Sequence, residues 1–187
     1  MKDRMNSKDN SSAGMENNVT DSIVLQGNVK IIVNDDKKGE YVHFNDKNVI
    51  TYAARKVMSH LLGDPSINGK INKLILGTGG QYPPNSGGGT GGDILTPIPP
   101  SRDETTLRSP LCEDAVFLGK VYQPVGDENE VKFTFVLGKD DGNGQGSVAY
   151  TEAGLFTVDE TMFAMETFPA LIKNSTRQIT FEWTIVF

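Results

Sequence analysis

The last nine residues constrain the fold most, because Ile179–Phe187 (ITFEWTIVF) alternates large apolar side chains with others along its length. An aromatic and β-branched run of this kind is typical of a strand with one buried face. The side chains that alternation assigns to the core are Phe181, Trp183, Ile185 and Phe187. We expect this strand to be tied into a sheet up to its final residue.

The rest of the chain predicts a mainly β fold. Similar runs, separated by turn-forming residues, lie at 23–33, 40–45, 71–76, 115–122, 131–137, 148–157, 162–168 and 178–187. The first two predict an antiparallel hairpin, with the turn at 34–39. About seven or eight strands with turn signals between them predict an antiparallel β-sandwich, which we place at residues 22–187. We expect its interior to include Leu155, Phe156, Phe163 and Phe168 beside the C-terminal strand.

One segment has helical periodicity, and we expect a single α-helix at about 48–62. Asn48 is a suitable N-cap, and Gly63 suits the position just past the C-terminal end. The apolar stripe of this helix comprises Ile50, Ala53, Ala54, Val57, Met58, Leu61 and Leu62. This stripe is expected to pack across one face or one end of the sheet.

Two segments lack the pattern of a packed element. Residues 1–21 are polar, and we interpret them as a flexible arm, with ordering on a neighbouring subunit as the alternative. Residues 78–114 are rich in Gly, Pro, Ser and Thr. Structureless segments of that length are uncommon inside compact domains, so this one predicts either disorder or an extended interaction loop.

Composition excludes several classes of function. The net charge is −6 and the basic residues form no cluster, which argues against nucleic acid as the main partner. No run of about 18 apolar residues is present, so we expect no membrane span. Cys112 is the only cysteine, so the fold is held without an internal disulfide.

Two glycine-rich loops resemble ligand sites by composition. Gly77–Gly80 follows a predicted strand as a phosphate loop would, but it lacks the Lys-Ser/Thr pair, and Pro83 prevents a following helix. The segment 139–144 (KDDGNG) resembles a calcium loop, yet Lys139 occupies the first ligand position and Tyr150 the position of the bidentate Glu. We interpret this second loop as a hairpin connection in which Gly and Asn supply positive φ.

The remaining candidate residues predict no chemistry. The spacing of His43, His60 and Cys112 does not form a zinc site. We therefore predict no catalytic, metal-binding or cofactor-binding residue, and no enzyme. Glu152 has two open interpretations: an exposed strand residue, or a partly buried carboxylate that accepts backbone N–H groups or pairs with a basic side chain, fixing a turn before Gly154.

Several motifs occur in an order that resembles a family of virion structural proteins of tailed bacteriophages. They are Leu74–Gly80 (LILGTGG), Thr105–Leu107 (TTL), Thr151–Phe156 (TEAGLF), Met162–Met165 (MFAM) with Thr167–Ala170 (TFPA), Lys173 and the closing Ile179–Phe187. In that family a helix precedes the LGTG strand and the chain ends I-x-W-x-I-x-F. The resemblance covers about residues 22–187, and TEAGLF and the ending are its most specific parts.

The resemblance implies a non-enzymatic subunit of the tail, neck or collar, baseplate or fibre attachment, located in the virion after assembly in the host bacterial cytoplasm. Its implied partners are other copies of itself, in a homo-oligomer, and other virion proteins. Residues 1–21 and the loop at 78–114, with its insertion at 81–100, are the expected contact regions. The alternatives are a capsid decoration or head-surface protein and a receptor- or carbohydrate-binding fibre module. For the latter the exposed aromatic candidates are Tyr82, Tyr122 and Tyr150.

Overall fold

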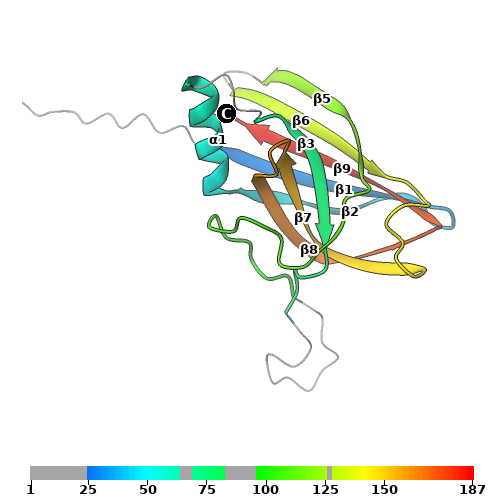
Figure 1. Cartoon of the computed structure of the whole chain (residues 1–187). Coiled ribbons are helices and arrows are strands. Elements are labelled where there is room, and N and C mark those ends of the chain that lie inside the picture. Colours follow the sequence, from blue (N-terminus) through cyan, green and yellow to red (C-terminus); the bar gives the residue numbers. More distant parts are fainter. Residues whose placement is uncertain (1–24, 64–68, 83–95, 126–127) are drawn as a thin grey trace, which may run out of the picture.

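The chain forms a strand-rich domain with one helix at its end (Figure 1). The computed structural model describes residues 25–63, 69–82, 96–125 and 128–187. Its elements are β1 (Gln26–Asp35), β2 (Gly39–Ile50), α1 (Tyr52–Gly63), β3 (Ile71–Gly77), β4 (Pro110–Cys112), β5 (Val116–Val125), β6 (Glu128–Leu137), β7 (Ser147–Thr157), β8 (Met162–Asn174) and β9 (Arg177–Val186). The mainly β fold with one helix is confirmed, with nine strands among the described residues where the sequence predicts about seven or eight. The arm predicted at 1–21 lies outside these residues.

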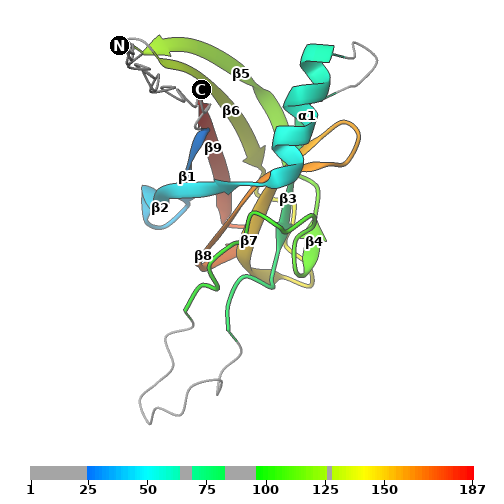
Figure 2. The ribbon, with the colours of Figure 1, turned by 90° about the vertical axis from the view of Figure 1, so that its left-hand side faces the viewer.

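The strands form one curled antiparallel sheet in the order β4-β3-β7-β8-β2-β1-β9-β6-β5. Figures 1 and 2 show that the half containing β3, β7 and β8 faces the half containing β1, β9, β6 and β5. Strand β2 joins the halves, because it pairs with β1 through Asn48 and then with β8 through Val49 and Ile50. The two expected layers are therefore the two halves of a single sheet, and β4 and β5 are its free edges.

The predicted hairpin between the first two strands is present as β1 and β2. The register shifts between Ile31 and Ile32, so a β-bulge lies there. Asp35 closes the turn, because its Oδ1 accepts hydrogen bonds from Lys37 N and Lys38 N. Its Oδ2 accepts a hydrogen bond from Arg177 Nε at 2.6 Å, which ties the hairpin to the start of β9.

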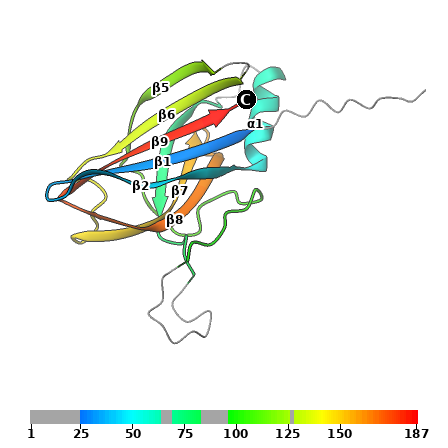
Figure 3. The same cartoon turned by 180° about the vertical axis from the view of Figure 1, so that it is seen from behind.

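The C-terminal strand β9 occupies the middle of its half, between β1 and β6, as Figure 3 shows. Trp183 lies opposite Val29 on one side and Phe133 on the other. Phe181, Trp183 and Ile185 are buried as predicted, together with Leu155, Phe156, Phe163 and Phe168 in the facing half. The prediction is wrong for Phe187, which is 46% exposed because it follows the last paired residue, Val186.

The helix begins later than the sequence suggests. Asn48 belongs to β2, because Val49 and Ile50 beyond it still pair with β8, so the predicted start and N-cap are wrong. Thr51 caps the helix instead, since its Oγ1 accepts a hydrogen bond from Ala54 N at 3.2 Å. Thr51 Oγ1 also donates to Met162 O at 2.7 Å, which fixes the start of α1 against β8.

The helix lies across the end of the sheet where β9 finishes (Figures 1 and 3). Within α1, Ala54 and Val57 are buried against the domain. The last turn extends past the sheet, so Leu61 is exposed and Leu62 is 90% exposed, contrary to the predicted stripe. In the described part of the chain, no helix is long and apolar enough to cross a membrane.

Candidate functional site

Glu152 in β7 is a fully buried carboxylate. Its Oε1 accepts hydrogen bonds from Ser109 N at 2.7 Å and Gly79 N at 3.1 Å, and its Oε2 accepts one from Arg108 N at 3.1 Å. The interpretation as a buried acceptor of backbone N–H groups is therefore correct, and the exposed-strand interpretation is wrong. The carboxylate joins the two flanks of the segment 78–114 rather than fixing a turn before Gly154, which lies inside β7.

The glycines after β3 allow this close approach. A Cβ atom added to Gly80 would collide with the carbonyl oxygen of Thr151, and one added to Gly77 would collide with Glu152 Oε1. Gly80 N donates to Thr151 Oγ1 at 2.9 Å. The N–H groups that a phosphate loop would offer to a ligand are thus used inside the domain, by Glu152 and Thr151 of the TEAGLF motif.

The second flank of the segment 78–114 packs on the outer face of β7 and β8. Leu107 is buried there in a small apolar cluster with Phe156, Met162 and Met165. The guanidinium of Arg108 supports the backbone of this flank by donating to Glu104 Oε1, Ile98 O and Pro99 O. Residues 96–114 are therefore a packed cover that ends in β4, and residues 83–95 lie outside the described part of the chain.

A buried lysine holds the other glycine-rich loop. Lys173 in β8 is fully buried, and its Nζ donates to Asn143 Oδ1 at 2.7 Å, Lys139 O at 3.0 Å and Asn174 O at 3.1 Å. Burial lowers the pKa of Lys173, and the nearby carboxylates of Asp141 and Asp140 oppose that shift. The loop oxygens that resemble calcium ligands are therefore bound to an ammonium group of the protein itself.

The predicted hairpin at 139–144 is wrong. The loop connects β6 in one half of the sheet to β7 in the other, and β6 pairs with β5 and β9 instead. Gly142 and Gly144 have positive φ as expected, at 63° and 54°. Asn143 does not, and it uses its side chain to bind Lys173 and Lys139 O. Composition predicted a turn here, but pairing of the flanking strands depends on the whole sheet.

The single cysteine is a buried free thiol. Cys112 is buried in β4, and burial raises the pKa of its thiol, which disfavours the nucleophilic thiolate. His43 lies on β2, where its Nε2 is 3.0 Å from Pro169 O, and His60 lies on α1. Among the residues that the structure describes, no group of three or more His, Cys, Asp or Glu side chains could hold a metal ion.

One of the three aromatic residues proposed for a carbohydrate site is buried in the domain. Tyr150 is buried and donates a hydrogen bond to Gly142 O at 2.7 Å, so its assignment as an exposed ligand contact is wrong. Burial also raises the pKa of Tyr150. Tyr82 is exposed. The side chain of Tyr122 lies outside the described part.

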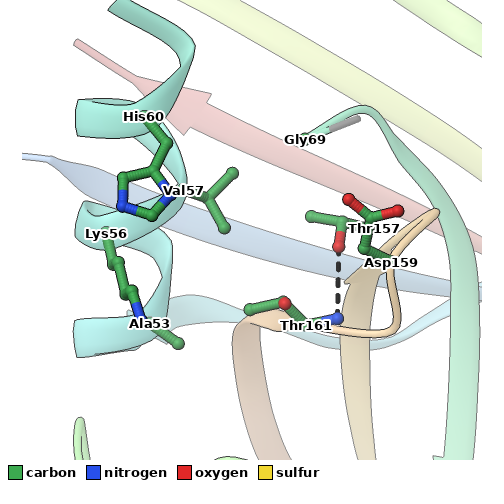
Figure 4. Close-up of a pocket in the computed structure, with 8 residues that line it drawn as sticks. All are labelled: Ala53, Lys56, Val57, His60, Gly69, Thr157, Asp159 and Thr161. Carbon is green, nitrogen blue, oxygen red and sulfur yellow. Dashed lines mark hydrogen bonds between the residues drawn. The ribbon is translucent and has the colours of Figure 1, made fainter. Parts of the chain in front are cut away.

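Two hollows flank α1, and the first is drawn in Figure 4. It has a volume of about 350 Å³ and lies between α1 and the turn joining β7 to β8. Lys56 and His60 line it from the helix, and Asp159 lines it from the turn. The hydrogen bond marked there joins Thr161 N to Thr157 Oγ1 at 3.1 Å, so it shapes the turn and does not connect His60 to an acid.

The second hollow, of about 260 Å³, opens beside the adjacent face of α1, and we call it the α1 groove. Its apolar lining includes Met58, Leu61, Ile71, Phe133, Ile185 and Phe187. The charged residues in its lining are Lys70 and Lys120. The exposure of Leu61 and Phe187 at one end of the domain is the feature that marks this groove, and the sequence placed both in the core.

Comparisons with protein-family models, with curated proteins and with solved structures give no significant match. No activity of a known relative therefore transfers to this chain. The buried charges described above, Glu152 and Lys173, anchor loops of the domain.

Proposed function

We propose that this chain is a non-enzymatic structural subunit of a tailed-phage virion, which makes assembly contacts in the tail, neck or baseplate. The observation that carries this proposal is the free edge of the sheet at β5. This ten-residue strand pairs with β6 on one side, and no other strand of the described residues pairs with its second side. Free strand edges are templates for pairing with another chain.

The side chains at this edge favour association. Val116 and Leu118 of β5 are exposed, as is Leu111 of β4 at the opposite edge of the sheet. The second part of β5 is less suited to pairing, because the register shifts before Gly119 and Pro124 has no N–H to donate. We therefore assign the contact with a neighbouring subunit to residues 116–118.

The motifs behind the resemblance have structural roles that fit an assembly module. Thr151 and Glu152 of TEAGLF hold the two flanks of the segment that contains the insertion at 81–100. Ala153 and Leu155 contribute to the core. A common domain that anchors a variable insertion suits a family whose members meet different neighbours. On this proposal the N-terminal arm and the insertion contact other virion proteins, in addition to the contact made by residues 116–118.

Antibody labelling tests the proposal directly. Antibodies raised against the purified protein should label particles of the phage that encodes it at the tail, neck or baseplate in negative-stain images. Label over the head would favour the capsid decoration alternative. Absence of the protein from purified particles by mass spectrometry would contradict the virion role altogether.

A further inference from the structure

We propose that residues 15–24, the part of the N-terminal arm next to β1, dock in the α1 groove of their own chain. This inference names the occupant of a surface on the domain, and it does not depend on the proposed virion role. It rests on the apolar lining of the groove, the point where the arm joins the domain, and the charges of both.

The groove offers an apolar surface that is open to solvent. Phe133, Phe163 and Ile185 reach it from the core, while Leu61 and Phe187 form exposed parts of its lining. Gly69 also lines it, and a Cβ atom added there would lie 2.6 Å from Val57 Cγ1. Gly69 therefore lies directly against the helix at one side of the hollow.

The arm joins the domain beside this groove. Gln26, the first residue of β1, pairs with Val186, and Phe187 follows Val186 in the groove lining. Leu25 is already buried in the main core. Since an extended residue spans about 3.3–3.6 Å, ten residues reach at most about 35 Å, which is ample to cross a hollow that starts next to Leu25.

The sequence of this part of the arm complements the groove. Its apolar residues are Met15, Val19, Ile23 and Val24, the first three at a spacing of four. Residues 9–24 contain Asp9, Glu16 and Asp21 and no Lys or Arg. The charged groups lining the groove are Lys70 and Lys120, so acidic positions flanking the apolar ones would face positive charge.

The covalent connection favours the arm of the same chain over that of a second copy. A segment tethered by a short linker has an effective concentration in the millimolar range, well above the concentration of a second copy in a dilute solution. Docking in this way narrows the part of the arm that can contact another molecule from residues 1–21 to residues 1–14, which carry Lys2, Arg4 and Lys8.

Disulfide trapping in the full-length protein tests the docking. Cys112 stays in place because it is buried, and the variant Ser22→Cys/Leu61→Cys places one new thiol in the arm and one at the groove. Mild oxidation should give an intramolecular disulfide, seen as a monomer of altered mobility on a non-reducing gel. Adding Val19→Ser and Ile23→Ser keeps the tether and the net charge and removes the apolar contacts, so the rate should fall about tenfold.

Charge reversal provides an independent readout. Lys70→Glu should slow trapping about threefold, and Asp21→Lys in the same protein should restore it, with the whole effect weakened at high salt. A matched variant, Ser7→Cys/Leu61→Cys, reports the rate for the distal arm. Circular dichroism checks that each variant is folded.

Two results would overturn the inference. A trapping rate that Val19→Ser and Ile23→Ser leave unchanged would show that the arm does not dock through these residues. A predominantly dimeric disulfide product would assign the groove to the arm of a second copy. Neither result bears on whether the protein is found in virions, because the antibody labelling tests that separately.

Discussion

Two loops of this protein look like binding sites for ligands of opposite charge, and both are occupied by the protein's own side chains. The loop after β3 presents N–H groups as a phosphate loop does, and these groups bind the Glu152 carboxylate. The loop between β6 and β7 presents oxygens as a calcium loop does, and these oxygens bind the Lys173 ammonium. A glycine-rich segment therefore indicates a loop whose backbone can surround a charged group, and that group can belong to a ligand or to the protein itself.

The two buried residues that hold these loops, Glu152 and Lys173, differ in whether they bind main-chain or side-chain groups of the loop. The hydrogen bonds that Glu152 accepts come from the main-chain N–H groups of Gly79, Arg108 and Ser109, which most residue types can supply. Lys173 depends in part on the side chain of Asn143. Apart from Gly79, where an added Cβ atom would collide with Arg108, the hydrogen bonds to Glu152 therefore require no particular side chain of their donors, while the contact with Lys173 requires Asn143.

A substitution in the core should destabilise the protein more than a substitution of Glu152 or Lys173. Trp183→Ala should lower the free energy of unfolding by about 3–5 kcal/mol, because it leaves a large cavity between Val29 and Phe133. Urea denaturation measures this, and Phe187→Ala is the matched control because its ring is half exposed. We also expect Trp183→Ala to prevent stable assembly, and particles that contain this variant at normal levels would refute that expectation.

Removal of the Glu152 carboxylate should have the next largest effect. Glu152→Ala leaves three backbone N–H groups without their acceptor, which we expect to lower the free energy of unfolding by about 3 kcal/mol. Hydrogen exchange should accelerate at Gly79, Arg108 and Ser109 more than in β9. Glu104→Ala, which removes a partly exposed partner of Arg108, should cost about 1 kcal/mol or less. Equal effects of the two substitutions would contradict the anchor role of Glu152.

Loss of the Lys173 ammonium should lower the free energy of unfolding by less than loss of the Glu152 carboxylate. Part of the energy of its hydrogen bonds offsets the cost of burying its charge. Lys173→Met keeps the stem and leaves Lys139 O and Asn143 Oδ1 unpaired, so we expect a loss of about 2 kcal/mol. Lys139→Met, which removes an exposed ion pair with Asp36, should change stability by about 0.5 kcal/mol or less. If Asn143→Ala acts through the same contact, its effect should be lost in the Lys173→Met background.

The sequence predicted the features that depend on local pattern. The inward face of β9, the β1–β2 hairpin and the existence of one helix follow from residue alternation, turn composition and helical spacing, and the structure has all three. It did not predict which strands pair across the domain, because that depends on contacts distant in sequence. The hairpin expected at 139–144 was wrong for this reason, since its flanking strands lie in opposite halves of the sheet.

The candidate site was less accessible to sequence analysis. Leu61 and Phe187 fit the apolar patterns of the helix and of β9, and only their position at the end of the domain exposes them in the α1 groove. The sequence left two interpretations of Glu152 open, an exposed residue and a buried acceptor. It could not decide between them, because no hydrogen-bond partner of this carboxylate lies nearby in sequence. Its three donors come from residues 43 to 73 positions away.

Another buried carboxyl group, that of Glu166 in β8, contrasts with Glu152. Its Oε1 accepts a hydrogen bond from the adjacent Thr167 N at 3.0 Å, in place of three donors from the loop flanks. Burial raises the pKa of Glu166 to about 7, the hydrogen bond from Thr167 opposes the shift, and the negative charge of Asp46 adds to it. A neutral Glu166 is therefore the form that the fold accommodates best.

The sign of the resulting pH dependence follows from linkage. Between pH 4.5, the usual pKa of a glutamate, and about pH 7, the folded chain holds a proton on Glu166 that the unfolded chain releases. The contribution of this group to stability is thus full below pH 4.5 and is lost as the pH rises through 7. Glu166→Gln should remove this dependence and stabilise the protein at pH 8 by on the order of 1 kcal/mol, measured by urea denaturation at pH 5 and pH 8. Glu152→Gln should destabilise the protein at pH 8, because the Glu152 carboxylate accepts three backbone hydrogen bonds. A change in unfolding free energy of the same sign for Glu152→Gln and Glu166→Gln would contradict the difference between the two sites.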